Sequence, residues 1–566
     1  MRIVTAKEMK EIDRRTATEH GIPTIQLMEG AGHALAEAVG NAEAITVFAG
    51  PGNNGGDGMT AARLLIEAGK EVHTFLAAEP ESLKGDAREQ YHLLSQKSDQ
   101  IHHPDSPAFR HADQAASEAD VLIDALLGTG ARGEPEGAIL HLVKSAEGAT
   151  HIIAADIPTG VDCDTGIAAG AYVMADETIV FGLPKRFLFQ NEGLEASGAW
   201  QVADIGHPDS LLNEYGDASL TALLDVLPGL PLRSKSDNKR RTGVVLVVAG
   251  SRNYPGALAL TCRGALRAGA GLVFAASSSE GLAGVRAQIP ECPLLLLPDE
   301  DGMLTEEAAD FVLERAAEAN VTVIGPGLGR GDGVRRFLGR LFEAAAYQLE
   351  QSGQSRKRTP RNSLSLWERV GVRAARTTGI ENWVLDADAL FHLPELKRMP
   401  PGVAILTPHE GEAGRLLGVD SADVSRDRFG AVKQLASRYE AVCLLKGSYS
   451  LIAAPDSDVM VNPTGNPLLA SGGTGDVLAG VIGTLFAARR SAFLAAVAGA
   501  LWHGQAADDI YEEENVGIGW TASEVADALP STLARLRQNL FEVIMGSADD
   551  GEDDDVWDEG DYQSLS

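Results

Sequence analysis

Two glycine-rich segments stand far apart in the 566-residue chain, and each ends in or near an acidic side chain. The first, Gly50–Gly58, reads GPGNNGGDG, and the second, Ser471–Asp476, reads SGGTGD. Each is positioned to open a helix, where free backbone N–H groups and the helix dipole attract an anion. Two such segments predict two active sites, and therefore a bifunctional enzyme.

The first segment directly follows the apolar run ITVFAG, which gives it a strand–loop–helix context. It is not a GxGxxG fingerprint, and no lysine follows it as in a nucleoside-triphosphate loop. Its glycines allow a positive φ and a close approach of ligand to backbone. Asn53, Asn54 and Asp57 add polar groups that can bind sugar hydroxyls or a cation.

Two later strand ends carry the same kind of residue. IDALLGTGARGE places Asp124, Gly128 and Gly130 after one apolar run, and AADIPTGVD places Asp156 and Thr159 after another. One aspartate alone could cap a helix. Ligands of parallel α/β sheets collect at the carboxyl ends of strands, so three such ends together predict one site.

The second segment carries the chemistry of phosphoryl transfer. Its backbone amides would stabilise charge on a transferred phosphoryl group, and Asp476 is placed to take a proton from an attacking hydroxyl. GPGLG, LDADAL, TPHEGE and LLKGSYS lie upstream, each at a predicted strand end. At such an end His409 is a better ligand candidate than a helix cap.

Composition excludes several classes of function. The net charge of −32 argues against nucleic-acid binding. The four cysteines have no metal-ligand spacing and are expected to be buried free thiols. The charged N-terminus is no signal peptide, and the longest apolar runs are too short to span a membrane. We expect no membrane partner and a cytoplasmic location.

Apolar runs alternate with amphipathic segments twice, which predicts two α/β domains, the first with a parallel sheet. We expect domains at 1–215 and 241–535, a connector at 216–240, an Arg-rich insertion at 351–378 and an acidic, disordered tail at 536–566. The predicted strands are, in the first domain, Ala44–Ala49, Glu71–Ala77, Val121–Leu126, His151–Ile157 and Thr178–Gly182, and in the second Val244–Ala249, Leu272–Ala276, Val321–Gly325, Trp383–Asp386, Ala404–Thr407, Val442–Leu445, Leu451–Ala454 and Val459–Asn462.

GPGNNGGDG, DALLGTG, DIPTGVD, FGLPK (Phe181–Lys185) and VADIGHP (Val202–Pro208) resemble the NAD(P)H-hydrate epimerase domain over about residues 1–210. The resemblance implies a Rossmann-like three-layer fold that interconverts the R and S 6-hydroxy adducts of NADH or NADPH. It implies a potassium ion at Asn54, Asp124 and Thr159. It also implies hydrate binding by Asn53, Asn54, Gly55, Gly56, Asp57, Gly128, Thr129, Gly130, Ala131, Arg132, Gly133, Glu134 and Asp156.

Asp156 is the expected catalytic residue of this first site. Epimerising a carbinolamine carbon requires its hydroxyl to leave and return, or the ring to open, and a carboxyl group there can supply and take the proton. A carboxylate turned away and held in an ion pair would argue against this role. One departure is Gly30, in LMEGAG, where the family usually has asparagine.

The second set of motifs, with GSRNYPGALAL (Gly250–Leu260), resembles the ADP- or ATP-dependent NAD(P)H-hydrate dehydratase, a ribokinase-like α/β domain, over about Gly243–Leu529. It implies that Asp476 is catalytic and that magnesium accompanies ADP or ATP. It implies hydrate contacts from Ala257, Gly327, His409 and Asp476, and adenine-nucleotide contacts from Lys446, Gly447, Ser448, Tyr449, Ser450 and Gly475.

Two other functions fit the same residues. A ribokinase-like small-molecule kinase of the hydroxymethylpyrimidine type would use the SGGTGD segment to leave a stable phosphate ester. A nucleotide-binding scaffold with dead sites is the other, and the intact Asp156 and Asp476 argue against it. Relatives of both domains suggest a homo-oligomer.

Overall fold

The computed structural model describes residues 1–231, 238–239, 242–351, 378–488 and 490–549, with side chains to residue 539. The chain forms two compact units. The first unit contains Met1–Leu220 and His409–Val461, and the second contains Thr221–Pro408 and the chain from Asn462 onward. The chain therefore enters the first unit twice. The predicted insertion lies, apart from its end residues, outside the described residues.

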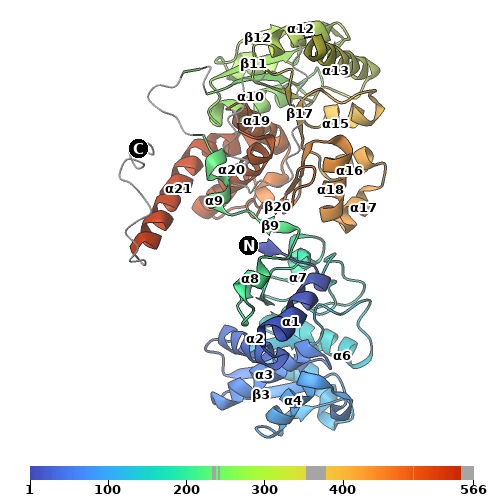
Figure 1. Cartoon of the computed structure of the whole chain (residues 1–566), viewed down its shortest axis with the longest axis vertical. Helices are drawn as coiled ribbons and strands as arrows, with labels where there is room; N and C mark the ends of the chain where they lie inside the picture. Colours follow the sequence, from blue (N-terminus) through green and yellow to red (C-terminus); the bar gives the residue numbers. More distant parts are fainter. Residues whose placement is uncertain (232–237, 240–241, 352–377, 489, 550–566) are drawn as a thin grey trace. The chain divides into compact units, whose positions relative to one another are not determined.

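A parallel sheet of seven strands forms the frame of the first domain (Figure 1). The five predicted strands are confirmed within one or two residues at their ends. The sheet also has two edge strands, β4 and β8, which the sequence analysis did not predict. The strand order is β4 (Ile101–His102), β3 (Glu71–Leu76), β2 (Ala44–Ala49), β5 (Val121–Ala125), β6 (Ile152–Ala155), β7 (Glu177–Phe181) and β8 (Ala199–Ala203).

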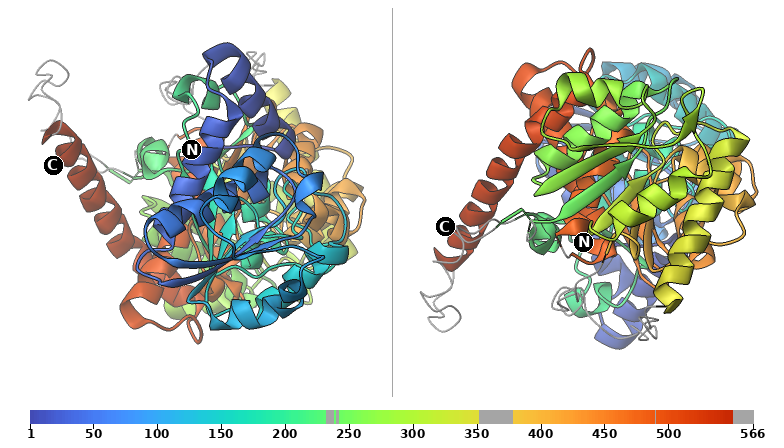
Figure 2. Two further views of the ribbon diagram at one scale, coloured as in Figure 1. Left: turned by 90° about the horizontal axis from the view of Figure 1, so that it is seen from below. Right: turned by 90° about the horizontal axis from the view of Figure 1, so that it is seen from above.

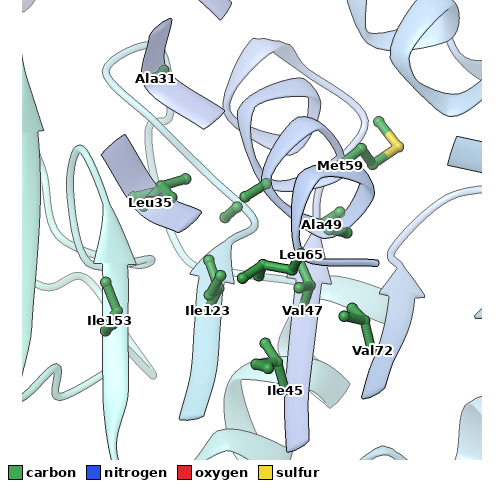
Figure 3. Packing of buried hydrophobic residues seen from close by; sticks show 14 of the residues in the cluster. Ala31, Leu35, Ile45, Val47, Ala49, Met59, Leu65, Val72, Ile123 and Ile153 are labelled. Atoms are coloured by element: carbon green, nitrogen blue, oxygen red, sulfur yellow. The ribbon is translucent and has the colours of Figure 1, made fainter. Parts of the chain in front are cut away.

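Helices cover both faces of this sheet because successive strand residues point to opposite sides. In β2, Val47 packs with Leu65 of helix α3 (Asn53–Glu67), whereas Phe48 packs in a separate core with Leu142 of α6 (Gly137–Ser145). Figure 3 shows the first of these cores, where α3 lies along β2 and β5. Helices α2 (Thr24–Ala38) and α4 (Gly85–Ser95) pack on the α3 side, and α5 (Ala112–Glu118) on the α6 side. The three-layer prediction is confirmed.

The rest of the first unit is built around short strands of a second, mixed sheet of eleven strands. Within this unit their order is β1 (Arg2–Ile3), β9 (Ala218–Leu220), β20 (Val459–Val461), β19 (Leu451–Ala453) and β18 (Val442–Leu445). Strand β9 lies inside the segment 216–240 that we expected to be a connector. Helices α16 (Glu410–Leu417), α17 (Ser421–Arg426) and α18 (Arg428–Tyr439) complete this part.

The second unit holds six parallel strands of that sheet, ordered β17 (Val403–Leu406), β16 (Asn382–Leu385), β15 (Val321–Ile324), β10 (Val244–Val248), β11 (Leu272–Ser277) and β12 (Leu294–Leu296). Helices α10 (Pro255–Arg267), α19 (Thr474–Ala487) and α20 (Ala492–Glu514) are apolar and largely buried. This confirms that the two Gly/Ala-rich helices are core. The chain is thus an α/β protein with two sheets, as predicted.

The end of the chain differs from its prediction. Helix α21 (Ala522–Asp549) continues through the first part of the segment we expected to be disordered, and Figure 2 shows it as one long helix. Residues 550–566, which hold most of the acidic run, lie outside the described residues. None of the helices that the structure describes is long and apolar enough to span a membrane.

Candidate active sites

The first glycine-rich segment is mostly helix. Helix α3 begins at Asn53, so Asn53–Gly58 form its first turns, as expected of a segment that opens a helix. None of its glycines has a positive φ, which corrects our reason for their presence. They allow close packing instead: a Cβ at Gly55 would lie 1.8 Å from the Gly50 carbonyl oxygen, and one at Gly58 would lie 2.5 Å from the Ala125 Cβ.

The three predicted potassium ligands meet at one place. The Asp124 carboxylate accepts hydrogen bonds from the Thr159 hydroxyl (2.7 Å) and the Thr159 backbone N–H (2.8 Å). The Asn54 amide donates to the Leu127 carbonyl (3.0 Å), and the Leu127 N–H donates to Thr159 Oγ1 (3.1 Å). Strand ends β5 and β6 and the start of α3 therefore bring these oxygen-bearing side chains together.

This cluster has the chemistry that a monovalent cation requires. Asp124 is fully buried, and burial raises its pKa to about 6 against the opposing hydrogen bonds of Thr159 and Leu126. No ion pair to Asp124 occurs within the described part of the chain. A buried carboxylate with only neutral partners, beside a hydroxyl and an amide, fits an oxygen-liganded cation.

Asp156 sits in a strained backbone conformation at the carboxyl end of β6. Its φ of 65° lies in the left-handed region, which side chains other than glycine, asparagine and aspartate rarely adopt. Its backbone N–H donates to the Ile179 carbonyl (2.8 Å). Such strain persists where the surrounding structure holds it, and it concentrates at functional sites.

The Asp156 side chain is paired with Lys185, which sequence reasoning missed as a site residue. Lys185 is completely buried, and its Nζ lies 2.5 Å from Asp156 Oδ1 and 2.7 Å from the Phe181 carbonyl oxygen. The Phe181 N–H also donates to Oδ1 (2.9 Å). FGLPK contained the signal, because a lysine four residues after a buried strand needs an anionic partner.

Because Asp156 is held in an ion pair, it is not a free base, and this is the arrangement that we expected to argue against its catalytic role. One of its two carboxylate oxygens could still reach a ligand. All hydrogen bonds of the carboxylate to the described residues use Oδ1, and a tenth of its side chain is exposed. Oδ2 remains available to a ligand.

Asp57 is a second carboxyl group near this pair. It is nine-tenths buried, and no described residue forms a hydrogen bond with it. Burial raises its pKa well above the usual value, and the charges of Asp156 and Asp13 raise it further, while Lys185 opposes them. Two carboxyl groups in different surroundings, one paired with a lysine and one without a hydrogen-bond partner among the described residues, therefore lie in one buried cluster, which suits acid–base catalysis.

The predicted binding segment Gly128–Glu134 lies mostly at the surface. Gly128 contacts Asn54, since a Cβ there would lie 3.2 Å from that side chain's Cβ. Arg132 instead forms ion pairs with Asp162 (3.0 Å) and Asp164 (3.2 Å). The structure thus brings only the start of this segment to Asn54.

Gly30 has a structural explanation. A Cβ at this position would lie 2.7 Å from the Ile205 carbonyl oxygen. The backbone of the DIGH segment therefore occupies the place that an asparagine side chain would need. His207 of the same segment is buried and pairs with Asp13 (2.9 Å).

In the second unit, two of the predicted hydrate-binding residues are neighbours. A Cβ at Gly327 would lie 2.8 Å from that of Ala257 and 2.7 Å from that of Tyr254. Ser251 donates to the Gly327 carbonyl (2.7 Å). The ends of β10 and β15 are thus tied together where ligands of parallel sheets bind.

The end of the next strand, β16, carries the LDADAL motif, whose backbone is also strained. Ala387 has φ 48° and ψ −118°, a conformation that few residues with a side chain adopt. Asp388 is held in this turn by the Gly329 N–H (2.8 Å) and by Arg330 (3.0 Å). Asp386 accepts from the Thr407 hydroxyl (2.8 Å). The turn therefore fixes three successive strand ends.

The second glycine-rich segment opens α19, as predicted. Gly473 is its N-cap with φ 95°, and a Cβ there would lie 2.4 Å from Leu260 of α10. Asp476 lies in the first turn and is half-buried. The first N–H groups of a helix have no partner within it. Gly475 and Asp476 therefore present amides and a carboxylate at one helix end.

His503 of α20 contacts the start of this helix. It is buried and hydrogen-bonded to the Thr474 backbone, and burial lowers its pKa to about 4. His503 is therefore neutral near pH 7. Sequence reasoning missed it, because a single histidine in an apolar helix gives no signal of its partner.

His409 forms a helix cap in the first unit. Its Nδ1 accepts from the Gly411 N–H (3.0 Å) and the Glu412 N–H (3.4 Å) at the start of α16. The Nε2 atom lies 3.5 Å from Glu412 Oε1, on a side chain that is 58% exposed. The structure therefore gives His409 the capping role that we ranked lower, with both ring nitrogens directed to the start of α16.

The predicted adenine-nucleotide residues Lys446–Ser450 form the turn between β18 and β19, which pair as an antiparallel hairpin. Gly447 and Ser448 are exposed, and the other three residues are half-buried. We call Lys446–Ser450 the hairpin loop.

Two family models match the chain. The model described as YjeF-related protein N-terminus matches residues 24–187, and the model described as NAD(P)H-hydrate dehydratase matches residues 245–346 and 370–531. A Moorella thermoacetica protein named "Bifunctional NAD(P)H-hydrate repair enzyme Nnr" is 36% identical over 96% of this chain and 99% of its own length. The Escherichia coli protein of that name is 32% identical over 89% and 88%.

The chain belongs to the family of bifunctional NAD(P)H-hydrate repair enzymes. Among solved structures, it resembles an ADP/ATP-dependent NAD(P)H-hydrate dehydratase from Bacillus subtilis co-crystallized with ATP/Mg2+. That match has 27% identity and a TM-score of 0.43, and it covers 56% of this chain and 98% of the other.

In this repair-enzyme chain, the residue before Gly30 connects the surrounding helices. Glu29 beside it pairs with Arg63 (2.6 Å) and accepts from the Gln90 amide (2.8 Å). An ion pair and a hydrogen bond of Glu29 therefore connect the helices α2, α3 and α4.

Proposed function

We propose that this repair enzyme acts at two separate centres, with Asp156 and Asp57 as the acid–base pair of the epimerase and Asp476 as the base of the dehydratase. The enzyme epimerises the R and S hydrates of NADH or NADPH and dehydrates the S form with ADP or ATP. The observation that supports this most is that one chain holds both Asp156 and Asp57, buried near Lys185, and Asp476, in the first turn of α19.

At the epimerase centre Asp57, whose pKa is raised by burial, protonates the departing 6-hydroxyl, which leaves as water. The ring nitrogen's lone pair compensates the positive charge, and the Asp156 carboxylate stabilises the cation. Water then adds to the other face, and its proton returns to the carboxyl pair. Lys185 is a positioning residue here, since it holds Asp156 through Oδ1.

Asn54, Asp124 and Thr159 would hold a potassium ion, whose charge would balance the buried Asp124 carboxylate and help bind the hydrate. The residues Asn53–Asp57 and Gly128–Glu134 would contact the nucleotide part of that hydrate. The same cluster of strand and helix ends would thus supply both binding and proton transfer in this centre.

At the dehydratase centre Asp476 takes the proton of the 6-hydroxyl, and the oxygen attacks the terminal phosphoryl group of the donor. The N–H groups of Gly472–Gly475 stabilise the developing charge. The ring nitrogen then expels phosphate, and loss of the neighbouring ring proton restores the dihydropyridine. With ADP the other product is AMP.

Ala257, Gly327 and His409 are proposed to contact the hydrate, and Gly475 and the hairpin loop the adenine nucleotide. Magnesium would accompany the phosphates, as in the dehydratase co-crystallized with ATP/Mg2+. We further propose a cytoplasmic homo-oligomer, with either NADH or NADPH hydrate accepted.

Incubation with racemic NADH hydrate and ADP or ATP, with and without potassium, tests the function. Return of the dihydropyridine absorbance for both epimers is expected. Recovery limited to half of the hydrate would contradict the epimerase activity. A stable phosphorylated product without NADH would support the small-molecule kinase instead.

A further inference from the structure

The hairpin loop rests on a buried junction inside the first unit. One side is the segment Lys185–Asn191, which lies between β7 and β8 of the seven-stranded sheet; the first matched family model ends within it, at residue 187, and we call the chain through β8 the epimerase half. The other side is α18 with the hairpin of β18 and β19, which belongs to the dehydratase half. The loop proposed to bind ADP is therefore in contact with the half that does not use ADP.

Arg428 is the centre of this junction. Its side chain is only 4% exposed, and its two terminal nitrogens donate to the Phe189 carbonyl (3.2 Å) and the Lys446 carbonyl (3.4 Å). Its Nε lies 3.1 Å from Glu410, at an angle that makes this contact an ion pair only. One guanidinium group thus joins the epimerase segment to the first residue of the hairpin loop.

The loop backbone follows the shape of this guanidinium group. A Cβ at Gly447 would lie on Arg428 Nη2, so the loop needs glycine where it passes over the arginine. The planar fork of arginine reaches two carbonyls at once, whereas lysine offers a single flexible ammonium group. The two hydrogen bonds of the Arg428 guanidinium group therefore fix the buried side of the loop, and few other side chains could form both.

An aromatic contact fixes the other end of the loop. The Phe189 and Tyr449 rings meet edge to face, with centroids 5.1 Å apart and an interplanar angle of 81°. Phe189 is completely buried and also packs edge to face on Trp200 of β8. The epimerase half thus provides a rigid support for the side chain of Tyr449.

We propose that Phe189 and Arg428 are positioning residues for the adenine nucleotide, so that the epimerase half sets the affinity of the dehydratase for ADP. This inference rests on the proposed function of Lys446–Ser450. A loop ordered before binding loses less conformational entropy when the ligand arrives, and therefore binds more tightly. Neither residue needs to touch ADP for this effect.

Phe189→Leu and Arg428→Lys test the proposal in the full-length enzyme. Each should raise the KM for ADP by about fivefold, with kcat and the KM for the hydrate changed less than about twofold, because only the nucleotide loop is loosened. ADP binding measured by calorimetry without hydrate should weaken by the same factor. Phe189→Tyr, which keeps the ring, should restore most of the affinity.

Lys433→Met is the matched control. Lys433 lies on the same helix as Arg428 and pairs with Asp217, which also pairs with Arg186 of the junction. Within the described residues it forms no hydrogen bond or ion pair with Phe189 or the hairpin loop. Its KM for ADP should stay at the wild-type value. An equal rise in all variants would mean general loosening of the junction and would overturn the proposal.

The two ideas fail in different ways. Wild-type enzyme that does not dehydrate the hydrate with ADP would overturn the proposed function. Active wild-type enzyme whose ADP affinity is unchanged by Phe189→Leu would overturn this inference alone. Thermal unfolding of each variant shows whether it is folded, and if Arg428→Lys does not fold, Phe189→Leu and Phe189→Tyr decide.

Discussion

The two glycine-rich segments are similar in sequence but differ in what their glycines do. In Gly50–Gly58 the glycines lie in ordinary helical or extended backbone and permit close contact between α3 and the sheet. In Ser471–Asp476, Gly473 takes a left-handed conformation that turns the chain into α19, while Gly472 has open space around it. The glycines of Gly50–Gly58 thus allow close packing, whereas those of Ser471–Asp476 shape the start of a helix.

The acids differ in the same way. Asp57 and Asp156 are buried with Lys185, and the charge of Asp156 raises the pKa of Asp57 while that of Lys185 lowers it. Asp476 is half-buried in the first turn of a helix, close to the glycines that open it. A glycine-rich motif thus marks a helix start, whereas the surroundings of the nearby acid determine which reaction can occur there.

Asp476→Asn should have the largest effect. It removes the proposed base of phosphoryl transfer, and dehydration should fall by about a thousandfold, within the range of general base catalysis. Epimerisation should be unchanged, since that centre uses other acids. The measurement is recovery of dihydropyridine absorbance with ADP, together with chromatographic separation of the epimers. Loss of both activities would contradict two independent centres.

Asp156→Asn should slow epimerisation by about a hundredfold, less than the preceding change because Asp57 remains as a second carboxyl group. Dehydration of pure S hydrate is the internal control and should persist. Binding of the hydrated nucleotide should also persist, since Asn53–Asp57 are intact. Epimerisation at the wild-type rate would remove Asp156 from the mechanism.

The contributions of Asp124 and His503 to the free energy of unfolding should change with pH in opposite directions. The folded-state pKa of Asp124 is raised to about 6, so without potassium the free energy of unfolding should fall by about 3 kcal/mol as pH rises from about 4 to above 6. The pKa of His503 is lowered to about 4, so its contribution of about 3 kcal/mol should be lost as pH falls from about 6.5 to 4.

Asp124→Asn and His503→Gln separate these contributions. Urea unfolding across this pH range should show each variant lacking one slope relative to wild type. Potassium should oppose the fall seen with Asp124 and have no such effect in Asp124→Asn. A potassium response that survives in that variant would place the ion elsewhere.

Gly55→Ala and Gly472→Ala sharpen the comparison of the two segments. The first places a Cβ 1.8 Å from the Gly50 carbonyl oxygen and should cost about 2 kcal/mol of stability or more. The second meets nothing within 4 Å and should change stability by less than about 0.5 kcal/mol. Thermal unfolding measures both, and equal losses would show that the segments do not differ in packing.

The sequence predicted what depends on local pattern. Buried apolar runs located the strands of both sheets, and motifs after them located Asp124, Asp156 and Asp476 at strand or helix ends. It did not predict short edge strands such as β4, whose two residues carry too little pattern. Nor did it predict the Asp156–Lys185 pair, which depends on how β6 and the turn after β7 approach each other.

The backbone of Asp156 restricts what can replace it. With φ at 65°, only asparagine or glycine could take its place without strain, and neither can carry a proton as aspartate does. A duplicated copy released from selection for epimerisation should therefore drift first to Asn or Gly at position 156, while keeping its fold. The residue at position 156 would then indicate whether a copy still carries the carboxylate that epimerisation requires.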